Sequence, residues 1–147
     1  MKKILLLSVL ALCFSCSDDD MDYSAQNEID ILAYIQESNL NFLKSNSGLY
    51  YRISSSGSGV SPNVNSNVTL GYKGYLLNGD VFDQSTSASF NVSGVVQGFG
   101  EAVRFLKPGG SGTFILPSKL GYGNTGSGNS IKGGDVIIFD INLIRIN

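Results

Sequence analysis

Apolar and polar residues alternate along most of the chain from residue 47 onward. An apolar residue at every second position is typical of a β-strand with one buried face. The pattern is broken by turn signals, of which Asn78-Gly79 is the clearest because this dipeptide favours a tight hairpin. A loop rich in Ser, Gly and Asn occupies 54–67. The alternation predicts strands at 47–53, at 68–77, from 81 onward, at 113–116 and at 136–146.

A different spacing, of three and four residues, marks the clearest helix at 95–107. Its apolar residues fall on one helical face, and Lys107-Pro108-Gly109-Gly110 ends the pattern. One helix that lies across an antiparallel sheet is an α+β arrangement. We therefore expect a single α+β domain over 47–147, with a core sufficient for a domain of that length.

A second helical pattern lies upstream, at 27–44, where Ile29, Leu32 and Ile35 recur among polar neighbours. It predicts one amphipathic helix, or two short ones that meet near Ser38-Asn39. Such a helix could lie on the domain, pair with a second copy, or act as a spacer. We expect the spacer.

The first residues have the pattern of a secretion signal. Lys2 and Lys3 precede an apolar run at 4–12, which is too short to span a bilayer as a lasting helix. The run leads into Cys13-Phe14-Ser15-Cys16, which resembles the lipobox of bacterial lipoproteins. We expect a signal peptide at 1–15, a lipid on Cys16, and an acidic tether with the short helix at 16–46. The predicted location is the outer membrane, facing the periplasm or exposed on the cell surface.

Ser17-Asp18-Asp19-Asp20 follows the predicted lipid site. The run is either a solvated acidic linker or a surface-export signal, which it resembles in Bacteroidetes lipoproteins. Removal of Lys2 and Lys3 with the signal takes the formal charge from −2 to −4, and no basic patch is present. Nucleic acid is therefore not an expected partner.

The composition leaves little scope for bond-breaking chemistry. The chain has no histidine, and its two cysteines both lie in the signal region, so the domain cannot form a disulfide. It has no HExxH, CxxC, GxSxG or P-loop pattern. No metal ion or cofactor is expected.

Four motifs, in this order, carry a family resemblance: GYKGYLLNGDVFDQS at 71–85, VVQGF at 95–99, LGYG at 120–123 and VIIFDINL at 136–143. Together they resemble the FKBP-type, macrolide-binding peptidyl-prolyl cis-trans isomerases. The resemblance covers the predicted domain. It implies an FKBP-like fold, in which a twisted antiparallel β-sheet wraps around one short α-helix.

The resemblance also assigns roles to residues of a shallow aromatic pocket. Those expected to act in catalysis are Tyr72, Phe82, Asp83, Val96 (through its backbone N–H), Phe99 as the floor, Tyr122 and Phe139. Those expected to bind substrate are Phe90, Val95 and Ile131, the last closing the rim. Taken singly, each is also an ordinary core, helix or turn residue.

The implied activity is isomerisation of Xaa-Pro bonds in exported proteins. The pocket would stabilise the twisted amide without covalent chemistry, and macrolide inhibitors would bind in the same place. The alternatives are an FKBP-like binding module, or a component of a cell-envelope or motility assembly, with weak or no catalysis. Two departures from the family bear on this choice. Phe99 stands where many members have tryptophan, and the loop at 124–134 is rich in glycine, which predicts a more mobile rim.

Overall fold

A computed structural model describes residues 21–147. The predicted signal at 1–15, Cys16 and the acidic run that follows it lie outside the described residues. Within this part of the chain the structure has two α-helices, six strands and two short 3-10 turns. In chain order they are α1 (Ser24–Ser38), β1 (Leu43–Lys44), β2 (Tyr50–Ser55), β3 (Asn67–Leu76), β4 (Val81–Asn91), η2 (Val92–Gly94), α2 (Gln97–Arg104), β5 (Ser111–Leu116), η3 (Ser118–Leu120) and β6 (Ile137–Ile146).

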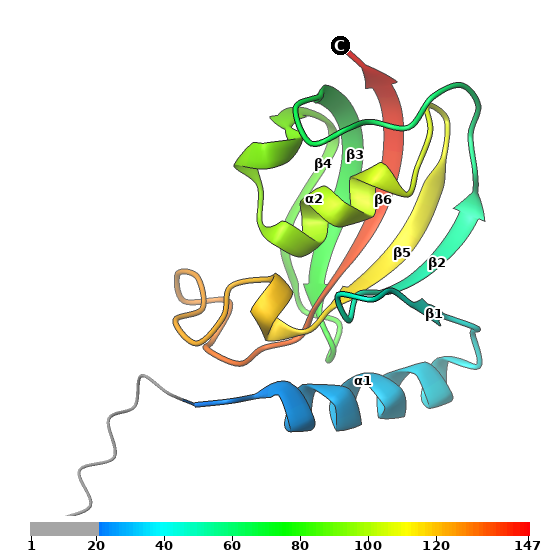
Figure 1. Cartoon of the computed structure of the whole chain (residues 1–147). Helices are drawn as coiled ribbons and strands as arrows, with labels where there is room; N and C mark the ends of the chain where they lie inside the picture. Colours follow the sequence, from blue (N-terminus) through cyan, green and yellow to red (C-terminus); the bar gives the residue numbers. More distant parts are fainter. Residues whose placement is uncertain (1–20) are drawn as a thin grey trace, which may run out of the picture.

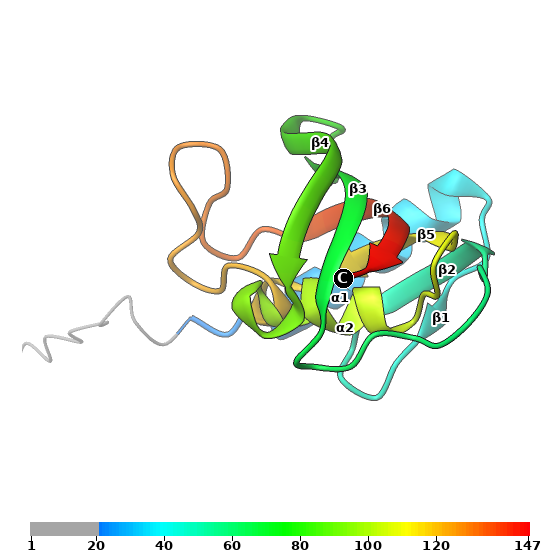
Figure 2. The ribbon, with the colours of Figure 1, turned by 90° about the horizontal axis from the view of Figure 1, so that it is seen from above.

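The strands form one sheet in the order β1-β2-β5-β6-β3-β4, with every neighbouring pair antiparallel. The sheet is strongly twisted and curves around α2 (Figures 1 and 2). Its alternating pattern sends successive side chains to opposite faces. Phe114 and Leu116 of β5 therefore belong to one core cluster, and Ile115 between them belongs to another.

The larger core lies between the concave face of the sheet and α2. The helix contributes Phe99, Ala102 and Val103, all buried. Gly98 lets α2 approach β5, because a Cβ at this position would come within 2.5 Å of Leu116. The α+β prediction of a twisted antiparallel sheet around one short helix is confirmed.

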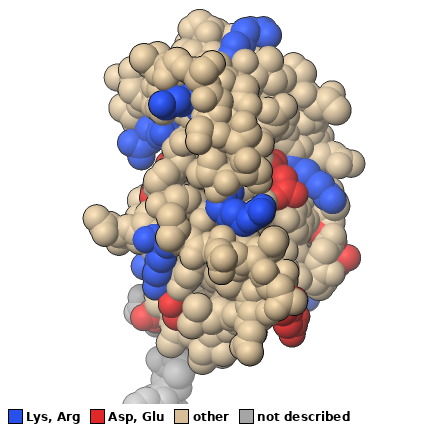
Figure 3. Space-filling view, turned by 90° about the vertical axis from the view of Figure 1, so that its right-hand side faces the viewer, with Lys and Arg blue, Asp and Glu red and all other residues tan. Residues whose placement is uncertain are grey.

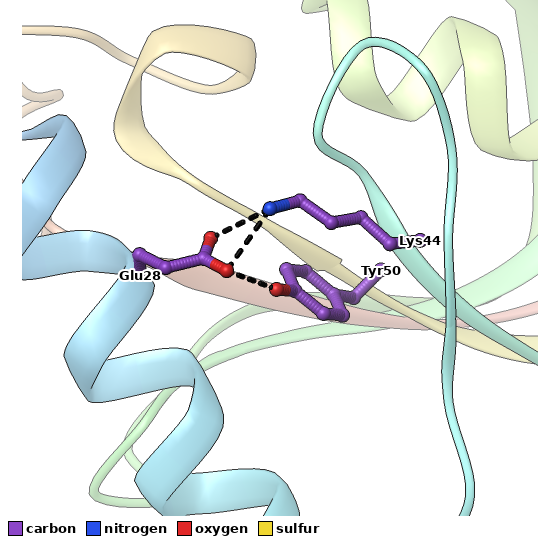
Figure 4. A network of polar contacts seen from close by, with 3 residues as sticks. All are labelled: Glu28, Lys44 and Tyr50. Carbon is purple, nitrogen blue, oxygen red and sulfur yellow. Dashed lines mark hydrogen bonds and ion pairs between the residues drawn. The ribbon is translucent and has the colours of Figure 1, made fainter.

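The second core lies on the opposite face of the sheet, beneath α1. Ile31 of α1 is fully buried, in a cluster with Ile115 and Ile138 of the sheet. At the edge of this second core, Glu28 of α1 accepts hydrogen bonds from Tyr50 of β2 and Lys44 of β1 (Figure 4). The spacer interpretation of this segment is therefore wrong, because the helix packs on the domain.

The helix boundaries also differ from those predicted. Residue Asn39 adopts a left-handed conformation (φ 54°) that ends α1, and β1 then joins the sheet, so 40–44 is not helical. At the other helix, Val95 and Val96 have extended backbones and precede α2. The Leu106 N–H donates a hydrogen bond to the Val103 carbonyl, which forms one more turn after α2 ends at Arg104. Leu106 is therefore still buried in the core.

Candidate active site

A cavity of about 350 Å³ opens where the start of α2 faces β3, β4, β6 and the start of the loop that follows η3. Apart from one carboxylate and two phenol hydroxyls, its side chains are apolar. The residues that line it are Tyr72, Phe82, Asp83, Phe90, Gly94, Val95, Val96, Phe99, Tyr122 and Phe139.

Two bulges in β4 aim its side chains at the cavity. The pairing of Gly74 with Asp83 and of Tyr75 with Val81 leaves Phe82 as an extra residue in β4. In a regular strand Phe82 and Asp83 would point to opposite faces, but a bulge reorients the strand locally. Both residues consequently line the same cavity. A second irregularity follows between the partners of Leu70 and Tyr72.

Aromatic rings build the floor and one wall. Phe99 of α2 is only 4% exposed and meets three other rings edge-to-face. Its ring centroid lies 4.8 Å from that of Phe139, 5.7 Å from Phe90 and 5.9 Å from Tyr72. Such pairs add about 0.5–1.5 kcal/mol each beyond the area that they bury. Phe99 therefore belongs to the core as much as to the cavity.

Gly74 makes the close ring packing possible. It lies on β3 opposite Asp83 and Phe139, and its missing side chain leaves room for two rings. A Cβ at Gly74 would lie 2.6 Å from the Phe82 ring and 2.7 Å from that of Phe139. The wall of the cavity therefore requires glycine at this position.

The polar edge of the cavity centres on Tyr72 and Asp83. The Tyr72 hydroxyl donates a hydrogen bond of 2.7 Å to Oδ2 of Asp83. Burial of the ring, together with this bond and the charge of Asp83, raises the pKa of Tyr72 to about 12. The phenol is therefore protonated at neutral pH, and it fixes the orientation of the carboxylate at the rim.

Two further polar groups border the cavity. Val96 caps the N-terminus of α2, and within residues 21–147 its backbone N–H donates to no other backbone carbonyl. Tyr122 reaches the cavity from the loop after η3 and packs partly against the core. An N–H donor and a phenol at an apolar cavity can hold a peptide carbonyl and exclude water around it.

The structure brings together all of the predicted site residues except Ile131. That residue is buried, at 5% exposure, within the main core cluster, and it does not line the cavity. It pairs with Ser127 in an isolated bridge that folds the loop back on itself, and this turns its side chain inward. Gly74 and Gly94 were not among the predicted site residues. Gly74 is the last residue of the GYKG motif at 71–74, so the motif contained a signal for it.

Among residues 21–147, no group of three or more His, Cys, Asp or Glu side chains is arranged to hold a metal ion. Neither of the two described helices combines the length and apolar character needed to cross a membrane. The polar atoms at the site are thus a carboxylate, two phenols and backbone amides.

The protein is a small α+β domain in which an antiparallel sheet surrounds a short helix. Its cavity is lined by aromatic rings and, within residues 21–147, contains no nucleophile paired with a base, so it is suited to binding an apolar group. A sequence model of the FKBP-type peptidyl-prolyl cis-trans isomerases matches residues 59–144. The chain belongs to this family, as its motifs predicted.

Proteins from several bacteria are similar to this chain. A probable FKBP-type peptidyl-prolyl cis-trans isomerase FkpA of Neisseria meningitidis is 39% identical over 104 residues, which cover 68% of this chain and 38% of that protein. The outer membrane protein MIP of Legionella longbeachae is 36% identical over 104 residues, covering 68% and 45%. The crystal structure of FkpA from Escherichia coli superposes with a TM-score of 0.75 at 29% identity, covering 84% of this chain and 61% of that one. The chain therefore spans less than half the length of either sequence relative.

Proposed function

We propose that this protein is a peptidyl-prolyl cis-trans isomerase that accelerates Xaa-Pro isomerisation in exported proteins. The observation that carries the proposal is the cavity itself, which combines edge-to-face rings with a few polar groups at its rim. Rotation about a peptide bond is slow because it must break amide resonance, a barrier of about 18–20 kcal/mol. The twisted amide separates less charge than the planar one, so a water-poor cavity favours it.

Each part of the site has a place in this mechanism. The rings of Phe99 and Phe139 form the floor on which a prolyl ring lies. The free N–H of Val96 holds the substrate carbonyl, and the Tyr122 hydroxyl contacts the same segment of backbone. Asp83, fixed by Tyr72, presents its carboxylate at the rim, opposite the amide that rotates. No bond is broken, so the reaction needs no group that exchanges a proton at neutral pH.

The same cavity is the proposed site for macrolide inhibitors. A mostly apolar cavity with a few convergent polar groups suits a bulky, largely apolar ligand. On the face that Figure 3 displays, positive and negative side chains are interspersed among broad uncharged areas. Binding of nucleic acid depends on clustered positive charge, which this face does not show.

We further propose a lipoprotein of Bacteroidetes type, held at the outer membrane by a lipid on Cys16. The support is the sequence of the first residues, together with the name of the Legionella relative as an outer membrane protein. The domain would face either the periplasm or the cell exterior. Cys16→Ala should leave the protein in the soluble fraction of cells. Recovery of this variant firmly in the membrane fraction would contradict the anchor.

The decisive experiment measures isomerisation of a proline-containing peptide by the chain from Ser17 onward. We expect catalysis that Asp83→Ala and Tyr122→Phe each reduce, while the thermal midpoint changes little. Asp30→Ala is the matched control, because Asp30 is a partly exposed carboxylate on α1 that accepts a hydrogen bond from the Gln26 side chain and lies outside the cavity. If the protein folds but neither accelerates the reaction nor binds a macrolide, the isomerase proposal is wrong and the binding-module alternative is favoured.

A further inference from the structure

Asn27 of α1 is a buried polar residue that the proposed reaction does not use directly. It is 2% exposed, and both ends of its amide are bonded to a distant part of the chain. Its Oδ1 accepts from the backbone N–H of Ser118 at 2.7 Å, and its Nδ2 donates to the carbonyl of Gly134 at 2.8 Å. Ser118 and Gly134 are the two ends of the segment that carries Tyr122.

These two bonds belong to a closed ring of hydrogen bonds. The Ser118 carbonyl accepts from Gly123 N–H at 2.8 Å, and the Gly123 carbonyl accepts from Gly134 N–H at 2.9 Å. Asn27 then joins Gly134 back to Ser118. Gly123 directly follows Tyr122, whose side chain lines the cavity. The ring therefore fixes the backbone next to a residue of the proposed active site.

Only a side chain with a donor and an acceptor on one planar group closes this ring. Asparagine meets that need, whereas aspartate keeps the acceptor but turns an oxygen toward the Gly134 carbonyl. Contacts one turn before and one turn after Asn27 also hold α1 in place. The Tyr23 ring lies so close to Gly134 that a Cβ there would come within 2.5 Å of it. One turn further along α1, Ile31 is fully buried against the sheet.

We propose that Asn27 is a positioning residue, which holds the 118–134 segment and thereby sets the place of Tyr122 at the cavity. The proposal deepens the proposed function, because it rests on Tyr122 contacting the substrate. It also gives α1 a role beyond packing. The helix that follows the tether fixes one wall of the site, although it lies on the face of the sheet opposite α2 (Figure 1).

The first test measures hydrogen exchange of individual backbone amides in the chain from Ser17 onward. Asn27→Ala and Asn27→Asp should each speed exchange at Ser118, Gly123 and Gly134 by about tenfold or more. Without the two bonds of Asn27, local opening of the loop breaks fewer hydrogen bonds and therefore costs less free energy. The control is Ile115→Val, which trims the core beneath α1 without touching the loop. Exchange at these amides that is no faster than in the control would overturn the proposal.

The second test uses catalysis. Asn27→Ala should lower kcat/KM by about tenfold, since small misplacements of a contacting group can cost up to a hundredfold. In the Tyr122→Phe background the same change should cost at most about twofold, because the hydroxyl that Asn27 positions is already absent. Equal losses in both backgrounds would overturn the proposal. If the wild-type chain proves inactive, the proposed function fails, and the exchange result alone decides whether Asn27 holds the loop.

Discussion

At the scale of single residues, Tyr72 links the apolar and polar parts of the cavity. Its ring lies edge-on to Phe90 and Phe99, with centroids 5.6 and 5.9 Å away, and its hydroxyl bonds to Asp83. The ring packing positions the hydroxyl, and the hydroxyl in turn positions the carboxylate. Resemblance to the family assigned both residues to the pocket, but their mutual bond follows from the pairing of β3 with β4.

The raised pKa of Tyr72 predicts a loss of stability at alkaline pH. An unfolded tyrosine ionises near pH 10, whereas folded Tyr72 ionises at about 12. Its contribution to the free energy of unfolding is therefore complete below pH 10 and is lost as the pH rises toward 12. Tyr72→Phe should lose less stability than the wild type over this interval, as measured by urea unfolding at stepped pH. Parallel curves for the two proteins would contradict the assignment, because the other tyrosines are the same in both.

Gly74 gives a second prediction at this scale. Gly74→Ala should destabilise the protein by about 1–3 kcal/mol, the usual cost of overpacking, and should weaken macrolide binding because the Phe82 and Phe139 rings must shift. Gly94→Ala is the control. Gly94 also lines the cavity, yet a Cβ there would meet nothing closer than 3.9 Å. Chemical denaturation and ligand titration of both variants would test this, and equal behaviour would show that the ring packing tolerates a methyl group.

At the scale of elements, α1 is attached to the sheet by a small polar network as well as by Ile31. The Glu28 carboxylate accepts a hydrogen bond of 2.6 Å from the Tyr50 hydroxyl and forms an ion pair with Lys44 at 2.9 Å (Figure 4). The hydrogen bond from Tyr50, then that from Lys44, lowers the pKa of Glu28 below its ordinary value. The ion pair is partly exposed, so solvent screens it and its contribution is small.

This network predicts that α1 is held less firmly in acid. A carboxyl group with a lowered pKa contributes stability above its ordinary value of about 4.3, and the contribution is lost as the pH falls through the folded value. The wild type should therefore lose stability below about pH 4.3 more steeply than Glu28→Gln, which carries no charge to protonate. Thermal midpoints between pH 3 and 7, a range chosen to bracket the ordinary value, would measure the difference. A mutant that follows the wild-type slope would show that Glu28 contributes nothing to the acid response.

At the scale of the whole molecule, the sheet separates two cores, and each is covered by a different helix. The core beneath α1 contains fully buried Ile115 and Ile138, and β1 extends the sheet beyond Tyr50. The predicted domain boundary at residue 47 would remove α1 and β1 together. A chain that starts there would leave an apolar face of the sheet in water.

We therefore expect the fragment 47–147 to be less stable than 21–147 by at least about 2 kcal/mol, the value of one buried isoleucine side chain. It should also aggregate more readily, because its uncovered sheet face is apolar. Urea unfolding and light scattering of the two fragments would measure both effects. Matching unfolding midpoints would mean that α1 adds little to the fold, and would weaken the positioning role of Asn27 as well.

Much of the fold was predictable from the sequence because its signals are local. Alternation of apolar residues marks the strands, since successive side chains of a strand point to opposite faces. The Asn78-Gly79 turn and the Lys107-Pro108 stop likewise depend on nearby residues alone. The motifs around Tyr72, Phe99 and Phe139 then indicated the family and nearly all of the residues that line the cavity. These determinants are the residues themselves and their order along the chain.

The remaining features arise from contacts between residues distant in sequence, and only the tertiary structure decided them. A bulge in β4 puts Phe82 and Asp83 on the same side, although strict alternation would separate them. Ile131 turns into the core because the loop pairs with itself. The face of α1 that carries Asn27 and Ile31 meets a sheet built from residues that come much later in the chain. Helical spacing shows that a face is apolar, but the partner of that face depends on which surface the folded sheet leaves uncovered.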